Sequence, residues 1–139
     1  DFERFHRECG RVLKPGGVIA VWTYEKFQAG AAIDSIVDRL YADVVGDYWP
    51  PERRYVDEAY QTLPFPWAEE RVPEFQLITE WSLEKAIGYL ASWSAVQRFK
   101  DERPGEDPVP ALAGELATLW PAAGTLRLNW PIHLRLGRS

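Results

Sequence analysis

Two side-chain types that often carry out acid–base or nucleophilic chemistry are rare in this sequence. There are two histidines, His6 and His133, and one thiol, that of Cys9. In one amphipathic segment, His6 falls on the polar side, which predicts a surface position, and Cys9 falls on the apolar side, which predicts a small core residue. For His133, packing or a backbone hydrogen bond is expected, and a catalytic role is the alternative. The pattern identifies no catalytic residue, and no histidine, cysteine and carboxylate cluster has metal-ligand spacing.

A second group of side chains has the chemistry to bind a small molecule. Trp93, Ser94 and Arg98 lie together in the stretch YLASWSAVQRF. A tryptophan can wall an apolar pocket, a serine can donate a hydrogen bond, and an arginine can pair with a carboxylate. Tyr24 ends an apolar run, which would place it at the carboxyl end of a strand, where open α/β sheets bind ligands. These four are candidate substrate-binding residues. Core packing is the alternative for Trp93, and lining of the sheet is the alternative for Tyr24.

Two further features bear on such a site. The aromatic and proline-rich stretch from Tyr48 to Trp67 could cap it, or could be an ordinary long connection. Arg127 and Arg135 alternate with apolar residues near the end of the sequence, which predicts a solvated strand face.

The glycine pair Gly16-Gly17 raises the question of phosphate binding. A phosphate loop follows a strand and opens a helix, because the free N–H groups of the helix N-terminus then point at the anion. Here the pair follows a helical pattern and precedes a strand pattern. The sequence therefore predicts a structural turn.

The elements that position these residues follow from hydrophobic periodicity. Val18–Tyr24 is apolar without polar alternation, which is typical of a strand buried on both faces. Residues 75–81 alternate, which predicts a half-buried strand at a sheet edge, and Pro131 predicts a bulge or bend in the last strand. The expected order is a helix over 1–13, a strand over 18–24, a helix over 29–46, a short helix from Pro51, a strand over 75–81, a helix from Ser82 through Phe99, a helix from Val109 to Trp120 and a strand over 125–137.

Composition narrows the class of protein. The sequence has 139 residues, 46% of them hydrophobic and seven of them tryptophan, which suffices for one folded domain. The net charge of −5 argues against nucleic acid as a partner. No apolar run matches a bilayer span, no signal-peptide pattern opens the sequence and there is one cysteine, so we expect no membrane partner and a cytoplasmic location. The lack of methionine indicates either processing or tag removal, or a piece of a longer protein, which we expect.

The segment FHRECGRVLKPGGVIAVWTY resembles the helix, turn and fifth strand of class I S-adenosylmethionine-dependent methyltransferases. It is most similar to the branch containing the quinone-biosynthesis and trans-aconitate methyltransferases. YLASWSAVQRF and WPIHLRLGR resemble C-terminal parts of the trans-aconitate-like members. The resemblance implies an α/β, partial Rossmann-like fold with strands in the order 5-7-6, flanking helices and an antiparallel last strand. Strand 5 would be residues 18–24, strand 6 residues 75–81 and strand 7 residues 125–137.

The same resemblance implies that residues 1–139 are a single domain, the C-terminal portion of a methyltransferase whose cofactor-binding half precedes them. The parent enzyme would use S-adenosylmethionine to methylate a small molecule, with carboxylic acids among the candidates, and this chain alone would bind no cofactor. Without strand 4, residues 18–24 would have an unpaired edge, which predicts self-association. The alternatives are a non-enzymatic, tryptophan-rich binding or protein-interaction module and a purely structural α+β domain.

Overall fold

The computed structural model describes residues 1–122 and 124–139, which form two compact units. The first unit comprises Asp1–Glu25, Glu52–Leu77 and Pro131–Ser139, and the second comprises Lys26–Pro51 and Ile78–Trp130. Within the described residues, no helix is long and apolar enough to cross a membrane.

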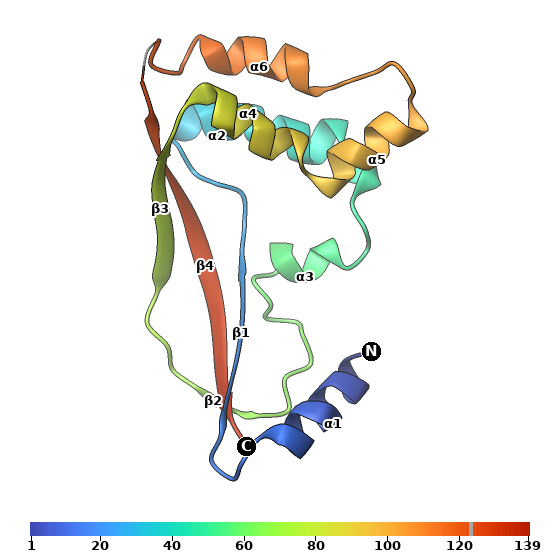
Figure 1. The fold of residues 1–139 in the computed structure, drawn as a ribbon, viewed down its shortest axis with the longest axis vertical. Coiled ribbons are helices and arrows are strands. Elements are labelled where there is room, and N and C mark those ends of the chain that lie inside the picture. Colours follow the sequence, from blue (N-terminus) through green and yellow to red (C-terminus); the bar gives the residue numbers. More distant parts are fainter. Residues whose placement is uncertain (123) are drawn as a thin grey trace. The chain divides into compact units, whose positions relative to one another are not determined.

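The first unit is organised around the end of strand β4. Its elements are α1 (Phe2–Val12), β1 (Val18–Tyr24), α3 (Arg53–Asp57), β2 (Ala68–Glu70) and the last part of β4 (Leu126–Arg138). Strands β1 and β2 both pair antiparallel with β4, and Figure 1 shows β1 running beside it. The expected antiparallel last strand is confirmed. The short strand β2 was not expected.

One face of β1 is open. Ile19 and Thr23 are buried, whereas Val18, Trp22 and Tyr24 are exposed, Trp22 by 64%. The prediction of burial on both faces is therefore wrong for this chain. Only one face is covered, by residues 60–70, which we call the strap.

Arg135 of β4 attaches the strap to the sheet. Its guanidinium donates to the carbonyl oxygens of Tyr60 (3.0 Å) and Leu63 (2.9 Å), and to both carboxylate oxygens of Glu69 (2.8 and 2.7 Å). It also lies over the Phe65 ring, 4.5 Å from the centroid. The expectation of a solvated Arg135 is wrong, because the strap turns this strand face into an interior surface. Arg127 is exposed, as predicted.

Gly137 lets the strap approach β4 closely. A Cβ at this position would lie 2.5 Å from the Trp67 Cβ and 2.9 Å from the Phe65 ring. Real Cβ atoms do not tolerate such contacts, so the packing of the strap requires glycine here.

Helix α1 contacts the strap through the helix side that the sequence pattern predicts to be polar. His6 Nε2 lies 2.8 Å from the Pro64 carbonyl oxygen, and the Trp67 indole N–H donates to His6 Nδ1 at 3.0 Å. The predicted surface position of His6 is thus wrong, because the strap offers one acceptor and one donor that the imidazole satisfies. Phe5 is exposed instead, and Cys9 is a half-buried free thiol outside the core, which corrects its predicted core position.

The glycine pair after α1 forms the predicted turn. Gly16 has a φ of 74°, which favours glycine. The Gly17 N–H donates to the Lys14 carbonyl oxygen (2.7 Å), and the Gly16 N–H donates to the Ser139 carbonyl oxygen (3.2 Å). Both amide groups are therefore engaged within the chain, and neither is free to bind an anion.

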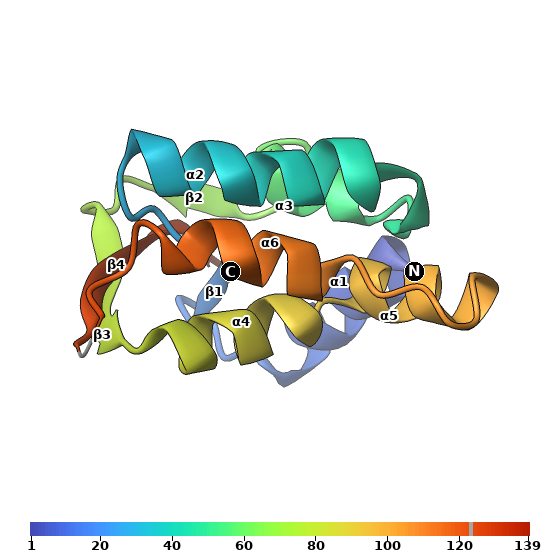
Figure 2. The ribbon, with the colours of Figure 1, turned by 90° about the horizontal axis from the view of Figure 1, so that it is seen from above.

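The second unit holds the larger apolar core. Helix α2 (Ala31–Asp38) continues as a π-helical segment, Arg39–Val44, and a 3-10 turn, Gly46–Tyr48, which together match the helix predicted over 29–46. Helices α4 (Leu83–Ala91), α5 (Ser94–Glu102) and α6 (Val109–Ala117) follow. Figure 2 shows α6 between α2 and α4, both of which it contacts.

Three details differ from the sequence pattern or refine it. The helix expected from Ser82 through Phe99 is two helices, because Trp93 has an extended backbone (φ −59°, ψ 135°) that ends α4 before α5 begins. Strand β3 (Phe75–Trp81) has the predicted bounds and pairs with β4. The predicted half-burial is wrong for its first part, where Phe75 and Leu77 are exposed, and is confirmed in its second part, where Thr79 and Trp81 are half-buried on either side of the exposed Glu80. Strand β4 runs without a break through Pro131, and the pairing that stops at Tyr24–Ile132 resumes at Gln28–Asn129, offset by one residue. The extra residue lies in the segment 25–27 and not in β4, so the bulge predicted at Pro131 occurs on the opposite segment instead.

Candidate functional site

A carboxylate–histidine pair lies at the carboxyl end of β1. Nε2 of His133 is 2.6 Å from Oε1 of Glu25. Both side chains are partly accessible, with 30% of His133 and 37% of Glu25 exposed. The pair combines a group that can carry a proton with a group that can orient it.

Strand pairing explains why these two residues meet. His133 of β4 lies directly opposite Thr23 of β1, so their side chains share one face of the sheet. Strand alternation returns Glu25, two residues after Thr23, to the same face. Tyr24 points to the opposite face, where it is 50% exposed. The first unit therefore places Tyr24 at the predicted strand end, but not beside His133.

The strap covers the same sheet face beside this pair. Arg135 lies two residues after His133 and therefore faces the strap from the same side of β4. Ala59, which precedes the strap, and Tyr60, which begins it, have φ angles of 53° and 61°, a region that costs non-glycine residues energy. The Tyr60 N–H donates to the Tyr55 carbonyl oxygen at 2.7 Å, and the hydrogen bond from Arg135 to Tyr60 adds a second hold on this turn.

The charges of Arg135 and Glu69 stabilise each other at the strap. Hydrogen bonding to the Arg135 guanidinium lowers the pKa of Glu69, and the same contact raises the pKa of Arg135. The pair is bidentate, the strongest geometry for an arginine and a carboxylate. Arg135 is therefore a structural anchor of the strap.

The three candidates of the second unit lie at the start of α5. Trp93 is 9% exposed and packs its ring against Tyr41, Trp49 and Tyr89, with centroids 5.7 to 6.1 Å apart. Ser94 is exposed, and Arg98 is exposed with one N–H donated to the Tyr48 carbonyl oxygen at 3.3 Å. Ser94 and Arg98 thus lie exposed on α5, Trp93 directly precedes that helix and is buried in the core, and Tyr24 belongs to the other unit.

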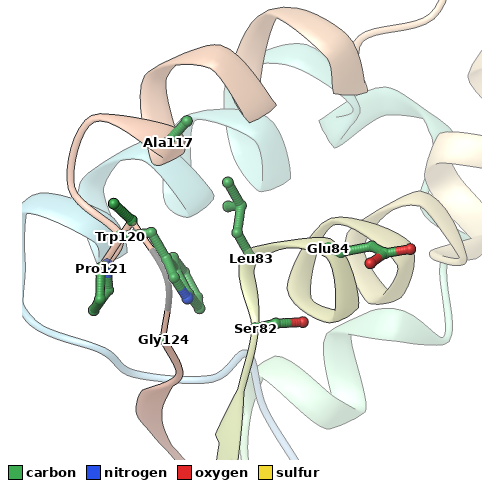
Figure 3. Close-up of a pocket in the computed structure, with 8 residues that line it drawn as sticks. Ser82, Leu83, Glu84, Ala117, Trp120, Pro121 and Gly124 are labelled. Carbon is green, nitrogen blue, oxygen red and sulfur yellow. The ribbon is translucent and has the colours of Figure 1, made fainter.

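The second unit also has an open groove of about 430 Å³, between the start of α4 and the segment after α6. Figure 3 shows Leu83 and Trp120 bordering it, with the Glu84 carboxylate pointing away. The Ser82 hydroxyl is used as the cap of α4 and accepts from the Lys85 N–H. The groove therefore has both polar and apolar lining, and no predicted site residue lines it.

The tryptophans do not form an exposed patch. Trp22 is exposed, but the other six are buried or half-buried. In the second unit they pack on one another, as in the Trp81–Trp130 pair with centroids 4.8 Å apart. A binding module that relies on a tryptophan-rich surface loses its support. In the part of the chain that the structure describes, no cluster of three or more histidine, cysteine or carboxylate residues could hold a metal ion.

Sequence reasoning missed the pair of Glu25 and His133. The two residues are 108 positions apart, and the segment WPIHLRLGR around His133 does not by itself point to Glu25. The signal that could have joined them is the antiparallel pairing of the last strand with residues 18–24. That pairing was expected, but without its register no partner could be assigned to His133.

The chain is similar to proteins named as methyltransferases. A solved structure from Anaeromyxobacter dehalogenans, described as a "putative type II methyltransferase", matches with a TM-score of 0.90 and 40% identity, over 99% of this chain and 59% of that one. A curated Dictyostelium discoideum protein named "putative methyltransferase" is 25% identical over 97% of this chain and 54% of that protein. No family model matches. The chain spans about half the length of this curated relative, and the similarities support a methyltransferase-related function without selecting a branch.

Proposed function

We propose that residues 1–139 are the C-terminal, substrate-side portion of a single class I methyltransferase domain that uses S-adenosylmethionine. The observation that carries this proposal is the match to the Anaeromyxobacter structure, which is close over 99% of this chain but covers only 59% of that one. We favour the quinone-biosynthesis and trans-aconitate-like branch, because RVLKPGG and WPIHLRLGR resemble it. The free thiol of Cys9 fits work in the reducing cytoplasm.

We further propose that the cofactor is held by the part of the enzyme outside this chain. The glycine pair Gly16-Gly17 does not fit an anion cradle, because both of its N–H groups are bonded to carbonyl oxygens of the chain. The isolated chain should therefore bind neither S-adenosylmethionine nor its demethylated product. A true ligand at 100 times its dissociation constant would stabilise the chain by about 2.7 kcal/mol. A saturable thermal shift with either compound would refute this point.

The substrate in this proposal is a small molecule, and small carboxylic acids are the class to test first. Arg98 supports that choice, because it is exposed, holds one backbone contact and can pair with a carboxylate. Ser94 is exposed beside it and can donate a hydrogen bond. Trp93 would back this site from the core of the second unit. Tyr24, which belongs to the first unit, is proposed separately as a substrate contact because it ends β1.

The test uses the intact protein that contains this chain. Calorimetric titration with S-adenosylmethionine should show binding, and transfer of a labelled methyl group to small acids should show activity. Ser94→Ala and Arg98→Ala should raise KM for the acceptor and leave cofactor affinity unchanged. Arg127→Ala is the matched control, because Arg127 is an exposed arginine of the same unit outside the proposed site. If both site variants had unchanged acceptor kinetics, the assignment of Ser94 and Arg98 to the substrate site would be refuted.

A further inference from the structure

We propose that His133 is the general base of the reaction and that Glu25 is its positioning residue. The methyl acceptor is then a hydroxyl group, a nucleophile too weakly acidic to be ionised by itself at neutral pH. This inference rests on the proposed function and specifies the chemical class of its acceptor atom.

The contact with Glu25 determines which nitrogen of His133 is available. An ionised carboxylate only accepts hydrogen bonds, so the nitrogen 2.6 Å from it, Nε2, carries the proton. In the neutral ring, Nδ1 then holds the lone pair. Among the described residues, nothing occupies Nδ1, and 30% of the side chain is exposed. A small acceptor can therefore reach a nitrogen that is ready to take a proton.

The other histidine shows what a structural imidazole looks like in this molecule. Both ring nitrogens of His6 are occupied, one by the Pro64 carbonyl oxygen and the other by the Trp67 indole N–H. That arrangement leaves His6 no atom to offer to a substrate. In His133, only one of the two ring nitrogens has a hydrogen-bond partner.

Location also favours a chemical role for His133. The pair lies where β1 ends, and open α/β sheets bind their ligands outside the carboxyl ends of their strands. The ion pairs Arg135–Glu69 and Arg138–Glu70 link β4 to β2 and hold the strap. The Glu25–His133 pair joins strands that already share a continuous ladder of seven residue pairs, so it adds little to their pairing.

The proposed step is a proton transfer. The O–H bond of the acceptor breaks, its electron pair stays on oxygen, and the proton forms a new N–H bond at Nδ1 of His133. The Glu25 carboxylate stabilises the resulting imidazolium. Such general-base catalysis contributes typically about 10²–10⁴-fold, and a carboxylate acceptor would gain nothing from it because it is already ionised.

Chemical labelling tests the availability of Nδ1 without relying on activity. Diethyl pyrocarbonate acylates unprotonated imidazole nitrogens, and mass spectrometry reads each histidine separately. In the intact protein we expect His133 to react at least tenfold faster than His6. Equal or slower labelling of His133 would overturn the inference.

A second experiment determines which group accepts the methyl group. Its substrates are hydroxybenzoic acids, each of which offers a hydroxyl and a carboxylate. Labelled methyl ethers resist alkali and methyl esters release methanol, so the product identifies the methylated atom. His133→Ala should lower kcat for ether formation by about 10²-fold or more with little change in KM, and added imidazole should restore part of it. Glu25→Gln should lower kcat less, and Glu25→Asp should retain more of it. Circular dichroism melts check that the variants fold.

The outcomes separate the two proposals. Ester as the product, or an unchanged kcat in His133→Ala, overturns the general base and leaves the methyltransferase standing. Failure of the intact protein to bind S-adenosylmethionine overturns the proposed function, whatever the labelling rates show.

Discussion

Replacement of Arg135 by methionine should release the strap from β4. The guanidinium makes four hydrogen bonds, two to the carbonyl oxygens of Tyr60 and Leu63 and two to Glu69. Methionine keeps much of the apolar stem but donates nothing. Each carbonyl left without its donor costs about 1 kcal/mol, because water reaches it poorly. Loss of the partner of Glu69, which is 45% exposed, costs about 1 kcal/mol.

The expected loss of unfolding free energy is therefore about 3 kcal/mol. With a urea m-value of about 2 kcal/mol per molar, this lowers the unfolding midpoint by about 1.5 M. Tryptophan fluorescence follows the transition, and hydrogen exchange should show faster exchange of strap amides at residues 60–70.

Arg138→Met is the matched control on the same strand. Arg138 also pairs with a β2 glutamate, Glu70, but through one nitrogen, with one further hydrogen bond to the Gly16 carbonyl oxygen at 3.3 Å, and 51% of its side chain is exposed. Exposed ion pairs contribute about 0–1 kcal/mol, so this variant should move the urea midpoint by at most about 0.5 M. Equal effects of the two replacements would refute the reasoning, because burial of Arg135 would then contribute nothing.

The same pair gives a pH dependence with a defined sign. Arg135 lowers the pKa of Glu69 in the folded protein relative to its unfolded value. The stabilisation is therefore fully present above the ordinary pKa of a glutamate and is lost as pH falls through the lowered pKa. Urea midpoints measured from pH 7 downward should fall less steeply in Arg135→Met than in the wild type. Parallel curves would contradict this origin of the acid sensitivity.

The other predictions concern packing and association. Gly137→Ala should destabilise the protein by about 1–3 kcal/mol, because a methyl group there collides with the strap, whereas Gly88→Ala, in a helix with open space around it, should stabilise by about 0.5–1 kcal/mol. Thermal melts of both variants measure this contrast. The chain should self-associate through Val18–Tyr24, whose outer edge pairs with no strand of the described residues. Light scattering across a concentration series should show Trp22→Lys weakening association and Leu119→Lys, an exposed apolar position elsewhere, leaving it unchanged.

Local patterns were sufficient for the bounds of most elements. The apolar run Val18–Tyr24 and the alternating residues 75–81 became strands with those same limits. These predictions depend only on periodicity and on breakers such as Pro15 and Gly16, which act over a few residues. Helix continuity was harder to predict. Ser82 through Phe99 has a helical pattern throughout, yet the helix is interrupted at Trp93, whose ring packs in the core.

Burial could not be read from the same patterns, because it depends on which segment covers a face. The last strand alternates apolar and polar residues, so Arg135 was assigned to solvent. The strap that covers it begins about 75 positions earlier in the sequence, at Tyr60. The alternation of apolar and polar residues in the last strand does not show that a distant segment will cover its polar face. The opposite error occurred at Phe5, where an apolar helix side lies exposed within this chain.

The two histidines show why residue type and periodicity are insufficient to assign chemistry. Both were assigned to polar sides, and both form hydrogen bonds to distant parts of the chain. What separates them is the number of ring nitrogens that the fold consumes. His6 gives both to the strap, which fixes the ring and removes it from chemistry. His133 gives one to a carboxylate, which fixes its tautomer and leaves the other nitrogen basic. A single bond to an acceptor thus prepares an imidazole for proton transfer, whereas a second bond would disable it.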